Sequence, residues 1–104
     1  MIVEAEVECK LIVDTGFSGC VYLPEDKISS WRLEFVSSAP ISLADQSTAI
    51  VDVYEANLIW FGASVRVAAL GGPDGCDSLL GMELLEGCRI ELDRSNGEVR
   101  IERL

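Results

Sequence analysis

The sequence predicts an all-β fold in one domain that spans residues 1–104. Three observations carry this prediction: apolar and polar residues alternate near both ends of the chain, turn-forming residues separate the apolar runs, and only two short segments favour a helix. A chain of 104 residues suits one core, whereas two domains would each be too small. Apolar residues make up 49% and charged residues 25%, which is the composition of a folded globular domain.

The first predicted strand covers residues 3–13. Odd-numbered positions from Val3 to Val13 are apolar, and the even-numbered positions 4, 6, 8 and 10 carry charge, as in a strand with one wet face. Over residues 11–13 both parities are apolar, which indicates that the strand enters an interior covered on both sides. The pattern therefore places the carboxylate of Asp14 at the end of a buried strand.

The middle of the chain predicts one short helix and two pairs of strands. Pro24 follows an extended run and suits the first position of a helix over residues 25–29. After a break at 37–40, strands at 41–43 and 49–54 flank a polar tip, so we expect a projecting hairpin. A second strand pair is expected at 58–61 and 65–70, joined through 62–64 and followed by an irregular loop at 71–75.

The last quarter predicts a short helix and a terminal hairpin. Residues 82–86 are good helix formers, and Gly87 supplies the left-handed residue that commonly closes such a turn. Apolar and charged residues then alternate on both sides of Asn96-Gly97, a pair that suits a type I′ turn. We expect one short helix in this half of the chain and a hairpin after it.

The charge balance excludes several classes of partner. Eighteen acidic against eight basic residues give a net charge of −10, so nucleic acid and anionic membrane surfaces are poor partners. The first residues show no export signal, and no apolar stretch approaches the ~18 residues of a membrane-spanning helix. The expected location is the cytoplasm.

The four cysteines predict neither a metal site nor disulfides. Cys9, Cys20, Cys76 and Cys88 lie far apart without a CxxC pair, and the chain has no histidine, so a zinc site is not expected. Reduced thiols that behave as small buried hydrophobes fit a cytoplasmic protein better than two disulfides. No metal and no cofactor are expected.

Asp14-Thr15-Gly16 at the end of a buried strand resembles the motif of the retropepsin-like aspartic proteases, in the single-lobed Asp-Thr-Gly-Phe-Ser-Gly variant of the bacterial and archaeal type. A second element agrees in order and spacing: Leu79-Leu80-Gly81 and the helix after it match the family's hydrophobic-hydrophobic-Gly segment. The hairpin at 41–54 occupies the position of the family's flap. The resemblance covers most of residues 11–92 and implies a closed all-β barrel with a flap hairpin.

The resemblance implies an aspartic endopeptidase that is active as a homodimer. Hydrolysis of a peptide bond by carboxylates needs one ionised group that activates water and one protonated group that polarises the carbonyl. Because the chain has one Asp-Thr-Gly, the second Asp14 comes from an identical subunit across a two-fold axis. In the family the threonine, here Thr15, bonds the backbone of the opposite subunit, and Gly16 lets the backbone approach the carboxylate.

The resemblance also assigns residues that bind a peptide or protein substrate. The flap closes over an extended peptide, which gains main-chain hydrogen bonds as an added strand. Leu80 and Gly81 border the same site. The expected flap tip consists of Ala44, Asp45, Gln46, Ser47 and Thr48.

Other interpretations of the same residues stay open. Asp14 could cap a turn after a strand, and a monomeric β-barrel of unrelated function is a further alternative. Phe17 stands where pepsin-like enzymes have serine and viral ones alanine, which favours a catalytically weak or inactive dimerisation or peptide-binding module. Family members usually carry about one further strand before the motif, so either Met1 is a late start or the dimer uses other surfaces, such as the terminal hairpin.

Overall fold

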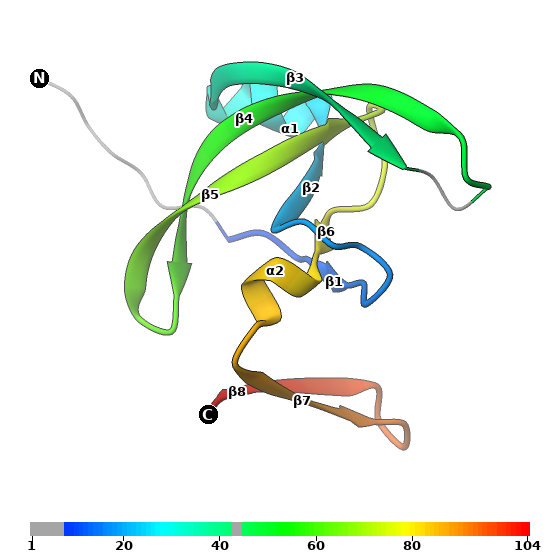
Figure 1. Cartoon of the computed structure of the whole chain (residues 1–104). Coiled ribbons are helices and arrows are strands. Elements are labelled where there is room, and N and C mark those ends of the chain that lie inside the picture. The colour runs from blue at the N-terminus through cyan, green and yellow to red at the C-terminus, as the bar shows by residue number, and fades with distance from the viewer. Residues whose placement is uncertain (1–7, 43–44) are drawn as a thin grey trace, which may run out of the picture.

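The structure, a computed structural model, describes residues 8–42 and 45–104. These residues form mostly β-structure, as the sequence predicts, with two short helices (Figure 1). The elements in chain order are β1 (Ile12–Val13), β2 (Val21–Pro24), α1 (Glu25–Trp31), β3 (Glu34–Ser42), β4 (Thr48–Trp60), β5 (Ala63–Gly72), β6 (Leu79–Leu80), α2 (Met82–Leu85), β7 (Cys88–Asp93) and β8 (Glu98–Arg103).

Six of the strands make one mixed sheet in the order β1-β6-β2-β5-β4-β3. The pairs β1–β6 and β2–β5 are parallel, and the other neighbours are antiparallel. Strands β7 and β8 form a separate two-stranded sheet, which lies below the larger sheet in Figure 1. Neither sheet closes on itself within the described part of the chain. Of the first expected strand, residues 3–7 lie outside that part, residues 8–11 form no strand, and β1 covers only Ile12–Val13. The expected burial on both faces is wrong at Ile12, which is 52% exposed.

The core lies between α1 and the centre of the six-stranded sheet. Strand β2 contributes Val21 and Leu23, α1 contributes Ile28, and β5 contributes Val67 and Ala69, all of them buried. Helix α1 begins directly after Pro24 and runs to Trp31, two residues beyond the expected end. Arg32, with φ of 54°, ends it in the left-handed conformation, and its N–H donates to the carbonyls of Ile28 and Ser29.

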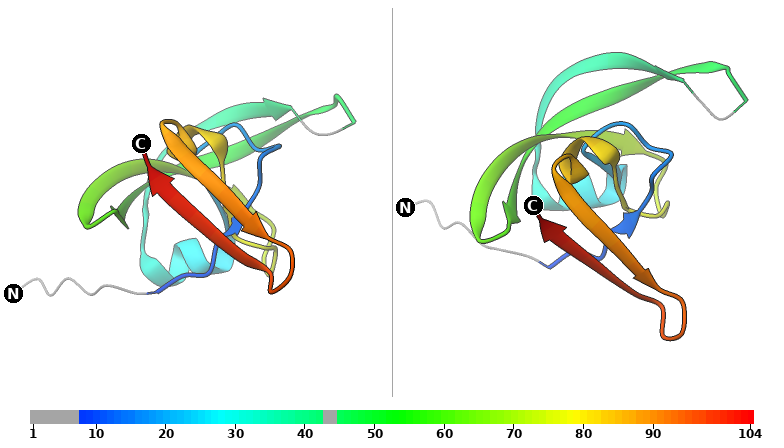
Figure 2. Two further views of the ribbon diagram at one scale, coloured as in Figure 1. Left: turned by 90° about the horizontal axis from the view of Figure 1, so that it is seen from below. Right: turned by 60° about the horizontal axis from the view of Figure 1, so that its bottom comes forward.

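Strands β3 and β4 form the expected hairpin, which projects from the body of the molecule in all three views (Figures 1 and 2). The predicted break at residues 37–40 is wrong, because these residues lie inside β3 and pair with β4. Strand β3 lies at the edge of the sheet, where Pro40, which has no N–H, is tolerated. The register between β3 and β4 shifts once, at a bulge between Phe35 and Ser37.

Three further boundaries differ from the predictions. The strand expected at 58–61 is the end of β4, which runs without interruption from Thr48 to Trp60. The turn after it is Phe61-Gly62, where φ is 50° and 79°, as a type I′ turn requires. Gly71 and Gly72, expected in a loop, end β5 and pair with Leu23 and Pro24.

The terminal hairpin is confirmed, but its turn is not type I′. Only Gly97 has positive φ, at 74°, whereas a type I′ turn needs two such residues. Four residues, 94–97, separate the strands, and the Asp93 side chain accepts from the N–H and hydroxyl of Ser95 at 2.9 and 2.6 Å. The short helix α2 and the positive φ of Gly87, 75°, agree with the sequence.

Candidate active site

Asp14 stands immediately after β1, at the end of the short parallel pair that β1 forms with β6. Its N–H donates to the carbonyl of Leu80 at 2.9 Å, which continues the β1–β6 ladder by one hydrogen bond. The side chain is partly buried. The parallel pairing therefore fixes the backbone of Asp14 while its carboxyl group keeps access to solvent.

The residues after Asp14 form a tight turn around its carboxyl group. The N–H of Gly16 donates to Asp14 Oδ1 at 2.9 Å, and the N–H of Phe17 donates to the Asp14 carbonyl at 3.1 Å. A Cβ on Gly16 would lie 3.3 Å from Asp14 Oδ1, so glycine allows the close approach. Thr15 is exposed at the top of the turn. Asp14, Thr15 and Gly16 thus form one compact unit.

Strand β6 joins the two segments on which the resemblance depends. It lies between β1 and β2, which are consecutive strands in the chain, and Leu80 pairs with Val13 on one side and Val21 on the other. The N–H of Gly81 donates to the carbonyl of Cys20, and the N–H of Met82 donates to the carbonyl of Phe17, both at 2.8 Å. The loop after Asp14 is thereby held against β6 and the start of α2.

Gly81 packs where no side chain fits. A Cβ at this position would collide with the carbonyl oxygen of Gly19 and lie 2.6 Å from Cδ2 of Phe17. Gly81 is buried, and Leu80 before it is 3% exposed. Both residues were predicted to border the site, and they lie beneath the Asp14 turn as part of its support.

Phe17 gives this turn an aromatic base. Its ring packs edge-on against Tyr22, with 6.1 Å between ring centroids, and also lies against Gly19 and Gly81. Burial, and then the nearby thiol of Cys76, raise the pKa of Tyr22. The residue that departs from the family pattern therefore has a packing role in this loop.

The flap tip is structured around Asp45. The N–H and hydroxyl of Ser47 donate to Asp45 Oδ1, at 2.9 and 2.5 Å. The hydroxyl, followed by the N–H, lowers the pKa of Asp45 below its usual range. Gln46 has a positive φ of 69°, and Thr48 begins β4 opposite Ser42. Ala44 lies outside the described residues, and no hydrogen bond joins residues 45–48 to Asp14.

One cysteine lies close to this region. Burial is the main cause that raises the pKa of Cys20, and the carboxylate of Glu83 raises it further by charge and by a hydrogen bond. A thiol with a raised pKa is a poor nucleophile, because the reactive form is the thiolate. In the described chain no group of three or more cysteine and acidic side chains could hold a metal ion.

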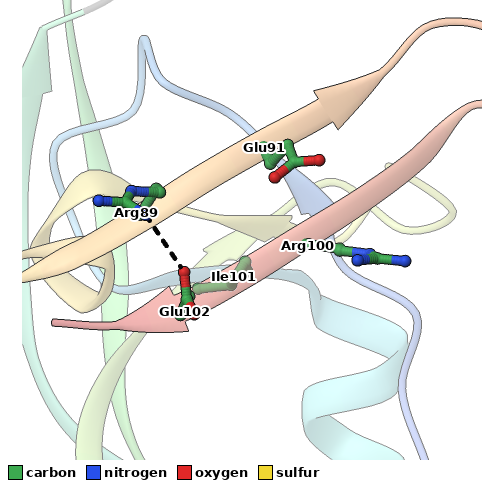
Figure 3. Close-up of a pocket in the computed structure, with 5 residues that line it drawn as sticks. All are labelled: Arg89, Glu91, Arg100, Ile101 and Glu102. Carbon is green, nitrogen blue, oxygen red and sulfur yellow. Dashed lines mark ion pairs between the residues drawn. The ribbon is translucent and has the colours of Figure 1, made fainter.

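Two surface cavities on the described part of the molecule touch neither Asp14 nor residues 45–48. One, of about 400 Å³, lies on the terminal hairpin (Figure 3), where the residues that line it are Arg89, Glu91, Arg100, Ile101 and Glu102. The other, of about 360 Å³, is lined by Trp31, Arg32, Leu33, Glu34, Glu55, Asn57 and Arg66. The sequence predictions named neither cavity.

Comparisons with known proteins give no functional assignment for this chain, so the assignment depends on the geometry of the site. No protein-family model matches the chain, and neither the curated proteins nor the solved structures contain a significant match. Among the described residues, no helix has the length and apolar content needed to cross a membrane.

Proposed function

We propose that this chain is an aspartic endopeptidase of the retropepsin-like type, active as a homodimer in which each copy contributes one Asp14. The observation that carries the proposal is the turn at Asp14, which is hydrogen bonded both within Asp14-Thr15-Gly16 and to Leu80 on β6. Two segments about 65 residues apart, each of which resembles a motif of the family, together support one carboxylate.

The chemistry requires a second carboxylate. When two aspartates lie about 3 Å apart they share a proton, because both cannot be ionised so close together. One then acts as the base that activates water, and the other donates a proton to the scissile carbonyl. The described residues offer Asp14 no lysine or arginine in an ion pair, which leaves its carboxylate free for this pairing.

The surroundings of Asp14 fit the roles that the family assigns. The Gly16 N–H bond at 2.9 Å orients the carboxyl group, and the exposed Thr15 is able to reach the backbone of an opposite subunit. The projecting β3–β4 hairpin fits a flap that closes over an extended peptide. The closed barrel of a single-lobed protease is part of this proposal, supported by the mixed sheet and by α2 directly after Gly81.

The test is digestion of a peptide library by the wild type and by Asp14→Asn. Asparagine keeps the size of the side chain and the oxygen that accepts from Gly16, so fold and association should persist while cleavage is lost. A statine-type transition-state mimic should inhibit the wild type. Unchanged cleavage by Asp14→Asn would reject the assignment.

A second candidate function is a peptide-binding module of the same fold without turnover. One observation favours it: the loop after Asp14 carries the aromatic Phe17, whose ring packs against Tyr22, where pepsin-like enzymes have serine. This candidate predicts that library peptides bind and remain intact from acidic to neutral pH. Cleavage that requires Asp14 would exclude it.

A further inference from the structure

The β7–β8 hairpin lacks the packing that a two-stranded sheet normally needs. Its strands pair with each other from Cys88↔Arg103 to Asp93↔Glu98, and within the described chain neither makes an extensive contact with another element. Figures 1 and 2 show it set apart from the six-stranded sheet. Because an isolated hairpin is marginally stable in water, and three or more strands with an apolar face are needed, this hairpin calls for a partner.

One face of the hairpin is largely apolar and partly open to solvent. It carries Cys88, Ile90 and Leu92 from β7, and Arg103, Ile101 and Val99 lie opposite them on β8. Cys88, Ile90 and Ile101 are half-buried. Leu92 is 60% exposed and Val99 44%. Within residues 8–42 and 45–104 each strand also has one free edge, because no third strand joins this sheet there. The free edges offer unpaired N–H and C=O groups to another strand.

The opposite face carries alternating charges. Arg89 and Glu91 of β7 lie opposite Glu102 and Arg100 of β8, and Arg89 Nη1 is 3.6 Å from Glu102 Oε2 (Figure 3). Figure 3 shows Glu91 and Arg100 directed away from that pair. Among these four residues the sign of the charge alternates along each strand and across the hairpin, whereas Asp93 and Glu98 at the turn end are both acidic.

The hairpin is also the neutral part of an acidic chain. Four of the eight basic residues lie between positions 88 and 104, where four carboxylates balance them: Arg89, Arg94, Arg100 and Arg103 against Glu91, Asp93, Glu98 and Glu102. The remaining residues carry the whole net charge of −10. Two copies therefore repel each other least when they approach through their hairpins.

We propose that β7 pairs edge to edge with β7 of a second copy, antiparallel, with the two-fold axis at Ile90. In this register Arg89 faces Glu91 of the second copy, and Cys88 faces Leu92 of the second copy. The product is a four-stranded sheet, β8-β7-β7-β8, in which the apolar residues of both copies share one face and Arg103 of each copy stands at opposite corners of it. On the charged face, each row across the four strands runs from Glu102 and Arg89 of one copy to Glu91 and Arg100 of the other. The charges along such a row alternate in sign.

The pattern selects this register over its neighbours. Moving the axis to an adjacent residue sets Arg89 opposite Arg89, or Glu91 opposite Glu91, and like charges directly opposite each other are destabilising. On β8, pairing Arg100 with Glu102 of a second copy would set Val99 against a charged Arg103. Arg103 is also engaged elsewhere, since its guanidinium lies 4.7 Å from the centre of the Phe61 ring.

This inference deepens the proposed function, because it names the surface where the two copies meet, and cross-linking tests it without turnover. In an Asp14→Asn background, Leu92→Cys should give a covalent dimer on mild oxidation that disappears when Cys88→Ser is added. Within one chain these positions are ~13 Å apart along the strand, too far for a disulfide. Val99→Cys is the matched control, because it lies a further strand away from Cys88 of the second copy.

Charge exchange provides a second measurement. Arg89→Glu and Glu91→Arg should each weaken self-association about tenfold in sedimentation, because like charges then meet across the axis. An equal mixture of these two variants should regain the self-association of the wild type. In the mixed dimer the carboxylates introduced in one variant face the guanidinium groups introduced in the other. Glu98→Arg changes the net charge by the same amount as Glu91→Arg but lies on β8, so it should leave self-association unchanged. If the mixture associates no more strongly than either variant alone, the proposed β7 register is wrong.

The outcomes separate this inference from the catalytic proposal. Cross-linking through Cys88 and restoration in the mixture, without any cleavage by the wild type, would establish the interface and reject only the catalytic role of Asp14. Cleavage that depends on Asp14, with no Cys88-dependent dimer and no restoration, would reject only the β7 pairing. Equal cross-linking of Leu92→Cys and Val99→Cys would also overturn it.

Discussion

Replacing Gly81 with alanine is expected to destabilise the protein more than any other glycine-to-alanine change in the candidate site. The new Cβ would collide with the carbonyl oxygen of Gly19 and lie 2.6 Å from Cδ2 of Phe17. Gly19 cannot retreat easily, because its carbonyl accepts from the N–H of Glu83 at 3.2 Å and the neighbouring Cys20 carbonyl accepts from Gly81 at 2.8 Å.

The size of the effect follows from this geometry. Overpacking a well-packed interior costs about 1–3 kcal/mol, and a backbone obstacle places this case at the upper end, at about 3 kcal/mol. A lost hydrogen bond would contribute about 1 kcal/mol of that amount. For a chain of this size the melting temperature should fall by roughly 10–20 °C.

Urea unfolding at a fixed protein concentration measures the change, because a fixed concentration removes any effect of self-association from the comparison. Gly16→Ala is the matched control. Its Cβ would meet only the movable side chain of Asp14, at 3.3 Å, so the free energy of unfolding should fall by less than about 1 kcal/mol. If Gly81→Ala lost no more stability than Gly16→Ala, the tight junction between β6 and the loop after Asp14 would be refuted.

Three smaller predictions concern single side chains. The hydrogen bond from Tyr54 to Glu25, 2.9 Å long, raises the pKa of Tyr54 to about 12, so its contribution to stability is complete below pH ~10 and is lost between pH ~10 and 12. A wild-type curve of unfolding free energy that runs parallel to that of Tyr54→Phe across this range would contradict it. Arg32→Gly should stabilise the protein by about 0.5–1 kcal/mol in urea, because glycine adopts a φ of 54° without strain; a loss of stability would contradict the αL cap. Ser47→Ala should raise the pKa of Asp45 toward its ordinary value in an NMR titration, and an unchanged value would exclude the hydroxyl as its cause.

Local patterns predicted most of the elements in this fold. The alternation around residues 88–103 predicted a hairpin, and the turn residues around Asp45 predicted the projecting pair β3–β4. The same reasoning failed where pairing overrides local preference. Pro40 and its serine neighbours belong to a strand because β3 is an edge strand with an available partner, and β4 stays continuous because β3 and β5 pair with successive parts of it.

The candidate site also depends partly on residues that are adjacent in the sequence and partly on contacts between distant segments. The turn at Asp14 follows from three adjacent residues, because a short acidic side chain followed by glycine accepts a bond from the backbone two positions later. The insertion of Leu80 between β1 and β2 depends on contacts between residues far apart in the chain. No periodicity encodes it, and the resemblance to a family supplied the only sequence signal that linked Leu80 to Asp14.

The central claim is that two Asp14 carboxylates, one from each copy, form a single catalytic pair. Mixing wild-type and Asp14→Asn chains at constant total concentration, with complete exchange of subunits, tests it most directly. Because only dimers with two wild-type chains would be active, an equal mixture should retain about a quarter of the wild-type cleavage rate. Retention of half the rate would mean that each chain acts alone, and would contradict the account.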